Sequence, residues 1–457
     1  MSEPQDAAPP VLHQPATSPD ATAAPNPLPL LRKIVMAPVK FFIGVSLCLN
    51  LTTSLLALGW THRLAQRIAL RHWWKRSTHK SEGDKFEDFA LGDEATAGHA
   101  HWPNWFLGQN FLSLLLSPLP DGKIGPRLWD LFRALTDSLR RNLVLGIQAA
   151  FNLFLLTLPA GLMWWYGWDY GWNISFFKGY EQFTVGVTTF AVGSLLFIGT
   201  MFYLPLAQAR QAVTGDWHAF WNIDLIINLI RGQWIWLLLL SGLIALLCLP
   251  VLILKTALPY SSESANIETV PQAIEFVQNY AFYSALFVFP AYVIIRVLAA
   301  KIYAHGLLRA VQEDRVDLRD LAETERAALQ RLELLESQPP VLQHWFWKIA
   351  GWLGSRIGQI LSAGILFWVW LALVAGIVIS EFFSYHEAGR AWWNQQLIQM
   401  PWFDYMPTYI AEEYPEKGLT SVAAQVGNAI FIALLTMSVR YAYQFFRDLI
   451  ANRRLPE

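Results

Sequence analysis

The stretch WIWLLLLSGLIALLCLPVLIL, residues Trp234–Leu254, decides the fold class. It contains no charged side chain, and a helix needs about 20 apolar residues to cross the roughly 30 Å hydrocarbon layer of a bilayer. A transmembrane β-strand would instead need about ten residues in which polar and apolar side chains alternate. Because this stretch is continuously apolar, it predicts a transmembrane helix.

Six further stretches of similar length and composition occur along the chain. They are Phe41–Trp60, Leu143–Trp165, Val185–Leu206, Tyr280–Ala300, Ile360–Ser380 and Gln425–Phe445. The whole composition agrees with them, since 54% of the 457 residues are apolar and 15% are charged, whereas soluble domains contain about 25% charged residues. We therefore expect an all-α integral membrane protein with about seven transmembrane helices, interfacial amphipathic helices and a cytoplasmic helical extension.

These stretches divide the chain into five regions. Residues 1–40 form a Pro- and Ala-rich tail whose composition predicts disorder, because it cannot bury enough apolar surface. The others are 41–142, with the first transmembrane helix and a basic cytoplasmic region; 143–300, a four-span core kinked by prolines; 301–358, a cytoplasmic helical segment; and 359–457, with the last two spans, an outer loop and a basic carboxyl terminus.

Basic residues are distributed unequally between the two sets of connections. The segments 61–142, 209–233, 301–358 and 446–457 hold 25 of the 34 lysines and arginines, and the opposite set holds seven. Because cytoplasmic loops carry an excess of basic residues, we expect a multi-pass protein of the plasma membrane (the inner membrane, if the source is a bacterium) with a cytoplasmic carboxyl terminus. The alternative is a re-entrant first segment with six spans, since a 40-residue tail without a signal peptide seldom moves outwards.

An aromatic and basic amphipathic stretch precedes the second, fourth and sixth expected spans, beginning at Pro126, Asp216 and His344. In each, apolar residues recur at intervals of three and four, which is typical of a helix in the membrane plane. The first two align with an offset of 91 residues that pairs Arg140 with Arg231. This pattern indicates an old duplication, although basic aromatic flanks are also common in membrane proteins generally.

The stretch YLPLAQARQAVTGDWHAFWNIDLIINLIRGQ, from Tyr203, resembles a family of prokaryotic multi-pass membrane proteins known mainly as a domain of unknown function. In that family a helix exit with LPLA-type residues, a Thr-Gly-Asp turn and an aromatic amphipathic helix precede the next span. The similarity covers about residues 126–300. It implies a multi-pass membrane protein and supplies no catalytic or ligand-binding residue.

Residues that would support catalysis or cofactor binding are sparse. None of the ten histidines lies in an expected span, and HExxH, GxxxxGK[ST] and GxSxG motifs do not occur. Only Arg296 and Arg440 are ionisable residues within the expected spans, both close enough to a cytoplasmic end to snorkel, which disfavours ion-coupled transport. We expect no cofactor, no metal site and no nucleic-acid partner, and nothing in the sequence indicates an enzyme.

Two sets of residues are candidates for binding. The first follows the first expected span and would attract anionic lipid by about 1 kcal/mol per charge, unless it serves only to orient the chain. It consists of Arg63, Arg67, Arg71, Lys75 and Arg76.

The second set lies on Gly306–Ser337, a run of helix-forming residues that would extend the fifth span about 45 Å into the cytoplasm. Its apolar stripe comprises Leu318, Leu321, Leu329, Leu332 and Leu335. A partner, self-association or the chain's own in-plane helices must cover this stripe, and Leu321, Leu329 and Leu332 are its candidate contacts. Because Glu325 interrupts the heptad, a docked amphipathic helix is favoured over a coiled coil.

The sequence thus favours a structural, scaffolding or accessory subunit that binds membrane lipids or a protein partner. The alternative is an uncoupled transporter or channel for a neutral or lipid-like solute, which would pass between the proline-containing spans. A membrane-embedded enzyme that acts on lipid is a third hypothesis.

Overall fold

The computed structural model describes residues 28–77, 86, 89, 124–168, 183–264, 267–335, 345–383 and 397–402. Contacts divide the chain into two units, residues 1–42 and residues 43–457. Helix α1 (Leu28–Leu47) begins in the first unit and ends in the second. The regular elements of the described part are helices, which confirms the all-helical fold class.

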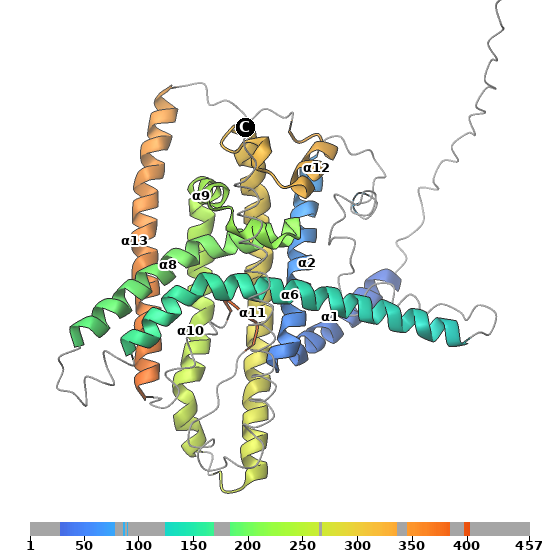
Figure 1. The fold of residues 1–457 in the computed structure, drawn as a ribbon, viewed down its shortest axis with the longest axis vertical. Coiled ribbons are helices and arrows are strands. Elements are labelled where there is room, and N and C mark those ends of the chain that lie inside the picture. The colour runs from blue at the N-terminus through green and yellow to red at the C-terminus, as the bar shows by residue number, and fades with distance from the viewer. Residues whose placement is uncertain are drawn as a thin grey trace, which may run out of the picture. The chain divides into compact units, whose positions relative to one another are not determined.

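The second unit holds the remaining elements (Figure 1). They are α2 (Leu51–Arg76), α6 (Ile124–Trp168), α8 (Phe183–Thr214), η3 (Trp217–Trp221), α9 (Ile223–Gly232), α10 (Trp234–Ser264), α11 (Val270–Gln312), η4 (Leu318–Asp320), α12 (Glu323–Arg331) and α13 (Trp345–Phe383). In the described part, five helices contain segments long and apolar enough to cross a membrane. They are Ser138–Gly167, Thr184–Thr214, Trp234–Leu254, Val270–Gln312 and Trp352–Ala372, and they coincide with the expected second to sixth spans.

The expected first span, Phe41–Trp60, is not one helix, so this part of the seven-span prediction is wrong. Helix α1 ends at Leu47, and Asn50 has an extended backbone (φ −130°, ψ 146°) before α2 begins. The hydroxyl of Thr53 donates to the carbonyl of Leu47 at 2.7 Å. A hydroxyl that bonds the preceding backbone competes with helical hydrogen bonding, which apolar composition alone does not reveal. The seventh expected span, Gln425–Phe445, lies outside the described residues.

Two of the three expected interfacial helices are not separate elements. The stretches that begin at Pro126 and His344 run without a break into the apolar parts of α6 and α13. No proline interrupts the chain where each stretch meets its span, and α13 continues through Gly358 at the second of these junctions. Only the stretch from Asp216 is separate, as η3 and α9, because Gly215 adopts φ 71° and ends α8.

Close contacts of small residues hold the central helices together. Helix α2 contacts α6, α8 and α11, while α10 contacts α11 and α13. A Cβ atom added to Gly59 of α2 would lie 1.8 Å from the carbonyl oxygen of Asn142, and one added to Gly146 of α6 would lie 1.9 Å from that of Leu55. The backbones of α2 and α6 therefore touch directly, a packing mode typical of membrane helices.

The expected continuous helix over Gly306–Ser337 is wrong, because α11 ends at Gln312. Asp314 adopts φ 52°. The N–H of Arg315 bonds the carbonyl of Ala310 at 2.9 Å, and that of Asp314 bonds the carbonyl of Val311 at 3.1 Å. These two bonds form a Schellman motif, in which a left-handed residue ends a helix.

Helix α12 ends with the same motif. Glu333 adopts φ 53°, and the N–H of Leu334 bonds the carbonyl of Leu329 at 3.1 Å. Both leucines are buried, which supplies the apolar contact that often accompanies this motif. The chain from 313 to 335 consequently turns back onto the rest of the second unit, in agreement with the docked amphipathic helix that the sequence favours over a coiled coil.

Candidate functional site

The turned-back segment buries the leucines that were candidates for partner binding. Leu321, Leu329 and Leu332 are 4%, 0% and 5% exposed, and all three belong to the main apolar core. Leu318 stays 42% exposed. The chain itself therefore covers most of the leucine stripe, so these three side chains are packing residues in the described structure.

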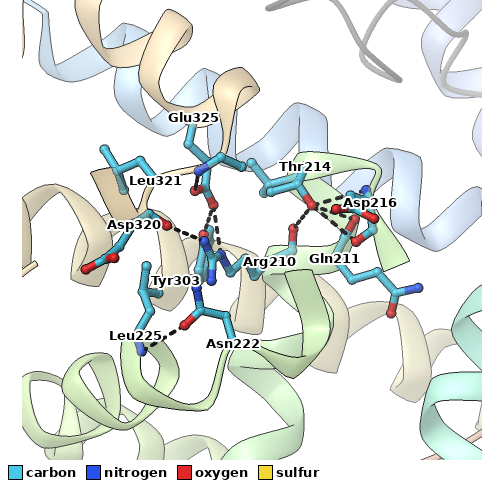
Figure 2. Close-up of polar contacts among 12 residues, drawn as sticks. Arg210, Gln211, Thr214, Asp216, Asn222, Leu225, Tyr303, Asp320, Leu321 and Glu325 are labelled. Atoms are coloured by element: carbon cyan, nitrogen blue, oxygen red, sulfur yellow. Dashed lines mark hydrogen bonds and ion pairs between the residues drawn. The ribbon is translucent and has the colours of Figure 1, made fainter. Parts of the chain in front are cut away.

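A buried polar cluster ties the segment to two long helices (Figure 2). We call it the polar clamp: Arg210 of α8, Tyr303 of α11 and Glu325 of α12. The Tyr303 hydroxyl donates to Oε1 of Glu325, and Nε of Arg210 lies 3.5 Å from the same oxygen. Nη2 of Arg210 donates to the carbonyl of Asp320 at 2.8 Å. All three side chains are buried.

Glu325 also caps its own helix. Its Oε2 accepts the backbone N–H of Ala322 at 2.9 Å, which is the reciprocal bond of a capping box. A buried carboxylate is tolerated only when it is paired and hydrogen-bonded, and here both oxygens have donors. The clamp therefore couples the start of α12 to the docking of the whole segment.

Further hydrogen bonds link α2, α11, the docked segment and Phe89. Nε1 of Trp73 donates to the carbonyl of Ala304 at 2.8 Å, and Oγ of Ser77 donates to the carbonyl of Leu332 at 3.0 Å. Nη1 of Arg331 donates to the carbonyl of Phe89 at 3.0 Å. The end of α2, the end of α11 and α12 thus form one packed region.

The five basic lipid candidates do not form one surface. Arg63 is 3% exposed, and its Nη1 donates to Oδ1 of Asn142 at 2.6 Å, which joins α2 to α6. Burial and the positive charge of Arg141 lower the pKa of Arg63 to about 9. Arg63 is therefore not available to a lipid headgroup, and its assignment as a lipid contact is wrong.

The other four candidates differ in exposure. Arg67 is half-buried, with its guanidinium carbon 5.4 Å from the centre of the Phe86 ring. Arg71, Lys75 and Arg76 are exposed at the carboxyl end of α2. These three remain accessible to a ligand.

The neighbouring helix α11 adds basic groups that sequence reasoning missed. Lys301 is exposed on α11, and the rings of His72 and His305 meet edge to face with their centres 6.0 Å apart. We call His72, Lys75, Arg76, Lys301 and His305 the basic surface. The helical spacing of Lys301 and His305 is visible in the sequence, but their proximity to α2 depends on the packing of two distant helices.

The charges that act on His72 at the basic surface are all positive. The pKa of His72 is lowered to about 4, first by burial and then by the positive charges of Arg76, His305, Lys301 and Lys75. None of Lys75, Arg76 and Lys301 forms an ion pair with a carboxylate in the part of the chain that the structure describes. Within the described residues, the surface is therefore a group of cations that have no carboxylate in an ion pair with them.

Arg296 does not snorkel, contrary to expectation. It is 4% exposed, and its Nη2 donates to the hydroxyl of Tyr292 and to the carbonyl of Ile398, each at 2.8 Å. Its partner segment, Leu397–Trp402, was expected in an outer loop but is buried, and Gln399 bonds the hydroxyl of Thr157. Local protein groups thus satisfy this buried cation.

Comparisons with protein families, curated proteins and solved structures give no match. The resemblance of residues 126–300 to an uncharacterised membrane-protein family therefore stays a prediction. Among the described residues, no group of three or more His, Cys, Asp or Glu side chains is placed to hold a metal ion.

Proposed function

We propose that the chain is a multi-pass protein of the plasma membrane, of the structural or accessory class, that binds lipid or a protein partner. The observation that carries this proposal is the exposure of the candidate spans. Within their apolar windows, between 12% and 50% of each span is buried by the rest of the chain. Contact of the remaining apolar surface with water is unfavourable, so this surface must lie against lipid or protein.

Helices α10 and α13 carry many exposed apolar side chains. On α10, Leu239, Leu246 and Ile253 are 57%, 61% and 63% exposed. Exposure in water forfeits about 1.5 to 3 kcal/mol for each such side chain relative to burial. Acyl chains remove this cost, and a contiguous apolar face of this kind is typical of a membrane-embedded helix.

Helix α13 supports an accessory role in particular. Its apolar window is the least buried of the five, at 12%. It contacts α10, where Nε1 of Trp370 donates to Oγ of Ser241 at 2.8 Å, and α8, where the ring of Phe197 lies against Trp370. Exposed side chains such as Ile360 and Trp368 are available to lipid or to a helix of another protein.

Polar groups inside the spans support structural roles rather than a solute path. Asn152 of α6 is buried, donates to the carbonyl of Trp217 at 2.9 Å and accepts from Nε1 of Trp221 at 3.0 Å. It therefore fastens η3 to α6. Uncoupled transport past the proline-containing helices α6, α8, α10 and α11 is the alternative function.

Membrane fractionation and copurification test the proposal. The chain should stay in the membrane pellet after alkaline carbonate washing, and a protein should copurify from mild detergent in a fixed ratio. Release by carbonate would contradict membrane integration. A copurifying solute, together with flux in reconstituted vesicles, would contradict the accessory role and favour transport.

A further inference from the structure

The basic surface contains three exposed cations that form no ion pair with any residue that the structure describes. Lys75 and Arg76 lie in the last turn of α2, Lys301 lies on α11, and the charges of all three act on the ring of His72. Arg309, further along α11, is different, because its Nε lies 2.6 Å from Oε1 of Glu313. The carboxylate of Glu313 is thus engaged by Arg309.

Like charges gathered at one place repel one another, and an anion that binds among them relieves the repulsion. The pKa of His72 is lowered first by burial and then by this positive field. In addition, Nε2 of His72 is buried and has no hydrogen-bond partner among the described residues. A neutral imidazole nitrogen beside three cations is suited to bond a phosphate oxygen.

The position of Lys301 along α11 fits the level of lipid headgroups. At 1.5 Å per residue, this 43-residue helix is about 65 Å long, roughly twice the hydrocarbon thickness. Lys301 directly follows the apolar stretch Tyr280–Ala300. If that stretch crosses the bilayer, Lys301 stands where the phosphate groups lie.

We propose that the basic surface binds the phosphate group of an anionic lipid headgroup, with Lys75, Arg76 and Lys301 as cationic contacts and His72 as a hydrogen-bonding contact. The proposal rests on the proposed membrane function, which puts α11 in a bilayer. It adds a second helix to the residues expected from sequence and removes Arg63 from them. Free phosphate offers the same chemistry and is separated from lipid by the experiment.

The test measures binding by the full-length protein in a neutral detergent. Short-chain phosphatidylglycerol, short-chain phosphatidylcholine and inorganic phosphate are titrated separately, and the shift in thermal midpoint gives the affinity. The test variant combines Lys75→Gln, Arg76→Gln and Lys301→Gln. The control variant removes three exposed arginines elsewhere, with Arg140→Gln, Arg231→Gln and Arg319→Gln.

We expect phosphatidylglycerol, and not phosphatidylcholine, to stabilise the wild type and the control. The test variant should bind it about 100-fold more weakly, from about a fivefold effect of each cation. Saturation by inorganic phosphate at the same concentrations would support the site with free phosphate as its source. Equal affinities of the test and control variants would overturn the proposal.

Two further checks keep the outcome interpretable. If the test variant unfolds more readily without lipid, the single variant Lys301→Gln is measured instead. Its affinity for phosphatidylglycerol should be about fivefold lower than that of the wild type. An unchanged affinity in this single variant would count against the site. Failure of the proposed membrane function is distinguishable, because it appears as release of the wild type by carbonate.

Discussion

Replacing Glu325 with alanine should release the segment 313–335 from the helices that hold it. The substitution removes a carboxylate that accepts from Tyr303 and Ala322 and lies 3.5 Å from Nε of Arg210. Among the described residues, Arg210 then remains buried and keeps the carbonyl of Asp320, at 2.8 Å, as a hydrogen-bond partner. Breaking a buried ion pair on one side costs about 3 to 5 kcal/mol.

Local opening should become correspondingly more frequent. Because about 1.4 kcal/mol changes an equilibrium tenfold, the open population should rise between roughly 100-fold and 4,000-fold. Limited trypsin digestion measures this, since Arg319 and Arg326 flank the clamp and cleavage requires an opened backbone. The initial cleavage rate at these two arginines, followed by mass spectrometry, should increase by that factor up to the rate of the unfolded chain.

Two variants make the result specific to the clamp. Glu323→Ala removes an exposed carboxylate from the same helix and should leave the cleavage rate within about twofold of wild type. The double variant Arg210→Met with Glu325→Leu removes both charges and should recover most of the protection, because apolar replacement of a buried pair is often neutral. Equal cleavage of Glu325→Ala and Glu323→Ala would refute the reasoning.

Three more predictions follow from the same structure. Gly59→Ala should destabilise the α2–α6 contact by about 2 kcal/mol, because the new Cβ would lie 1.8 Å from a backbone oxygen. Gly242→Ala, which has open space around it, should be neutral or stabilising. Thermal midpoints in detergent compare the two variants. The pKa of His72 is lowered to about 4 in the native chain. As pH falls from about 6.5 to 4, the imidazole therefore binds a proton in the unfolded chain but not in the native chain. The free energy of unfolding should therefore fall over this pH range, and it should fall less in His72→Gln. Equal slopes of unfolding free energy against pH for the two proteins would disprove this prediction. A single cysteine at Gln312 should be protected from an impermeant external thiol reagent, whereas one at Ser264 should react, and the reverse pattern would invert the orientation.

The sequence predicts the long helices well, because a helix is the structure that a long and continuously apolar run forms in a membrane. Trp234–Leu254 and Val185–Leu206 both lie within helices at the expected places. Helix ends are harder to predict. The breaks after α11 and α12 occur at Asp314 and Glu333 rather than at glycine, so the usual residue signal for a left-handed end is missing.

The candidate sites depend on contacts between distant parts of the chain. Arg63 meets Asn142 79 residues later, and the carbonyl that Arg210 bonds lies 110 residues away. From residue type alone, Arg63 is predicted to be a surface cation and Glu325 to interrupt the heptad pattern. Their burial follows from the packing of α2, α6, α8 and α12, which no local pattern encodes.

Spin labels on neighbouring residues of α13 test the membrane account most directly. Ile365 is 59% exposed and Leu366 is 1% exposed, so a nitroxide on the first should face acyl chains and one on the second should face the protein. In bilayers, the label at Ile365 should collide readily with oxygen and rarely with a water-soluble nickel chelate, and the label at Leu366 should collide rarely with either. Frequent collision of the Ile365 label with the nickel chelate would place this apolar face in water and contradict the account.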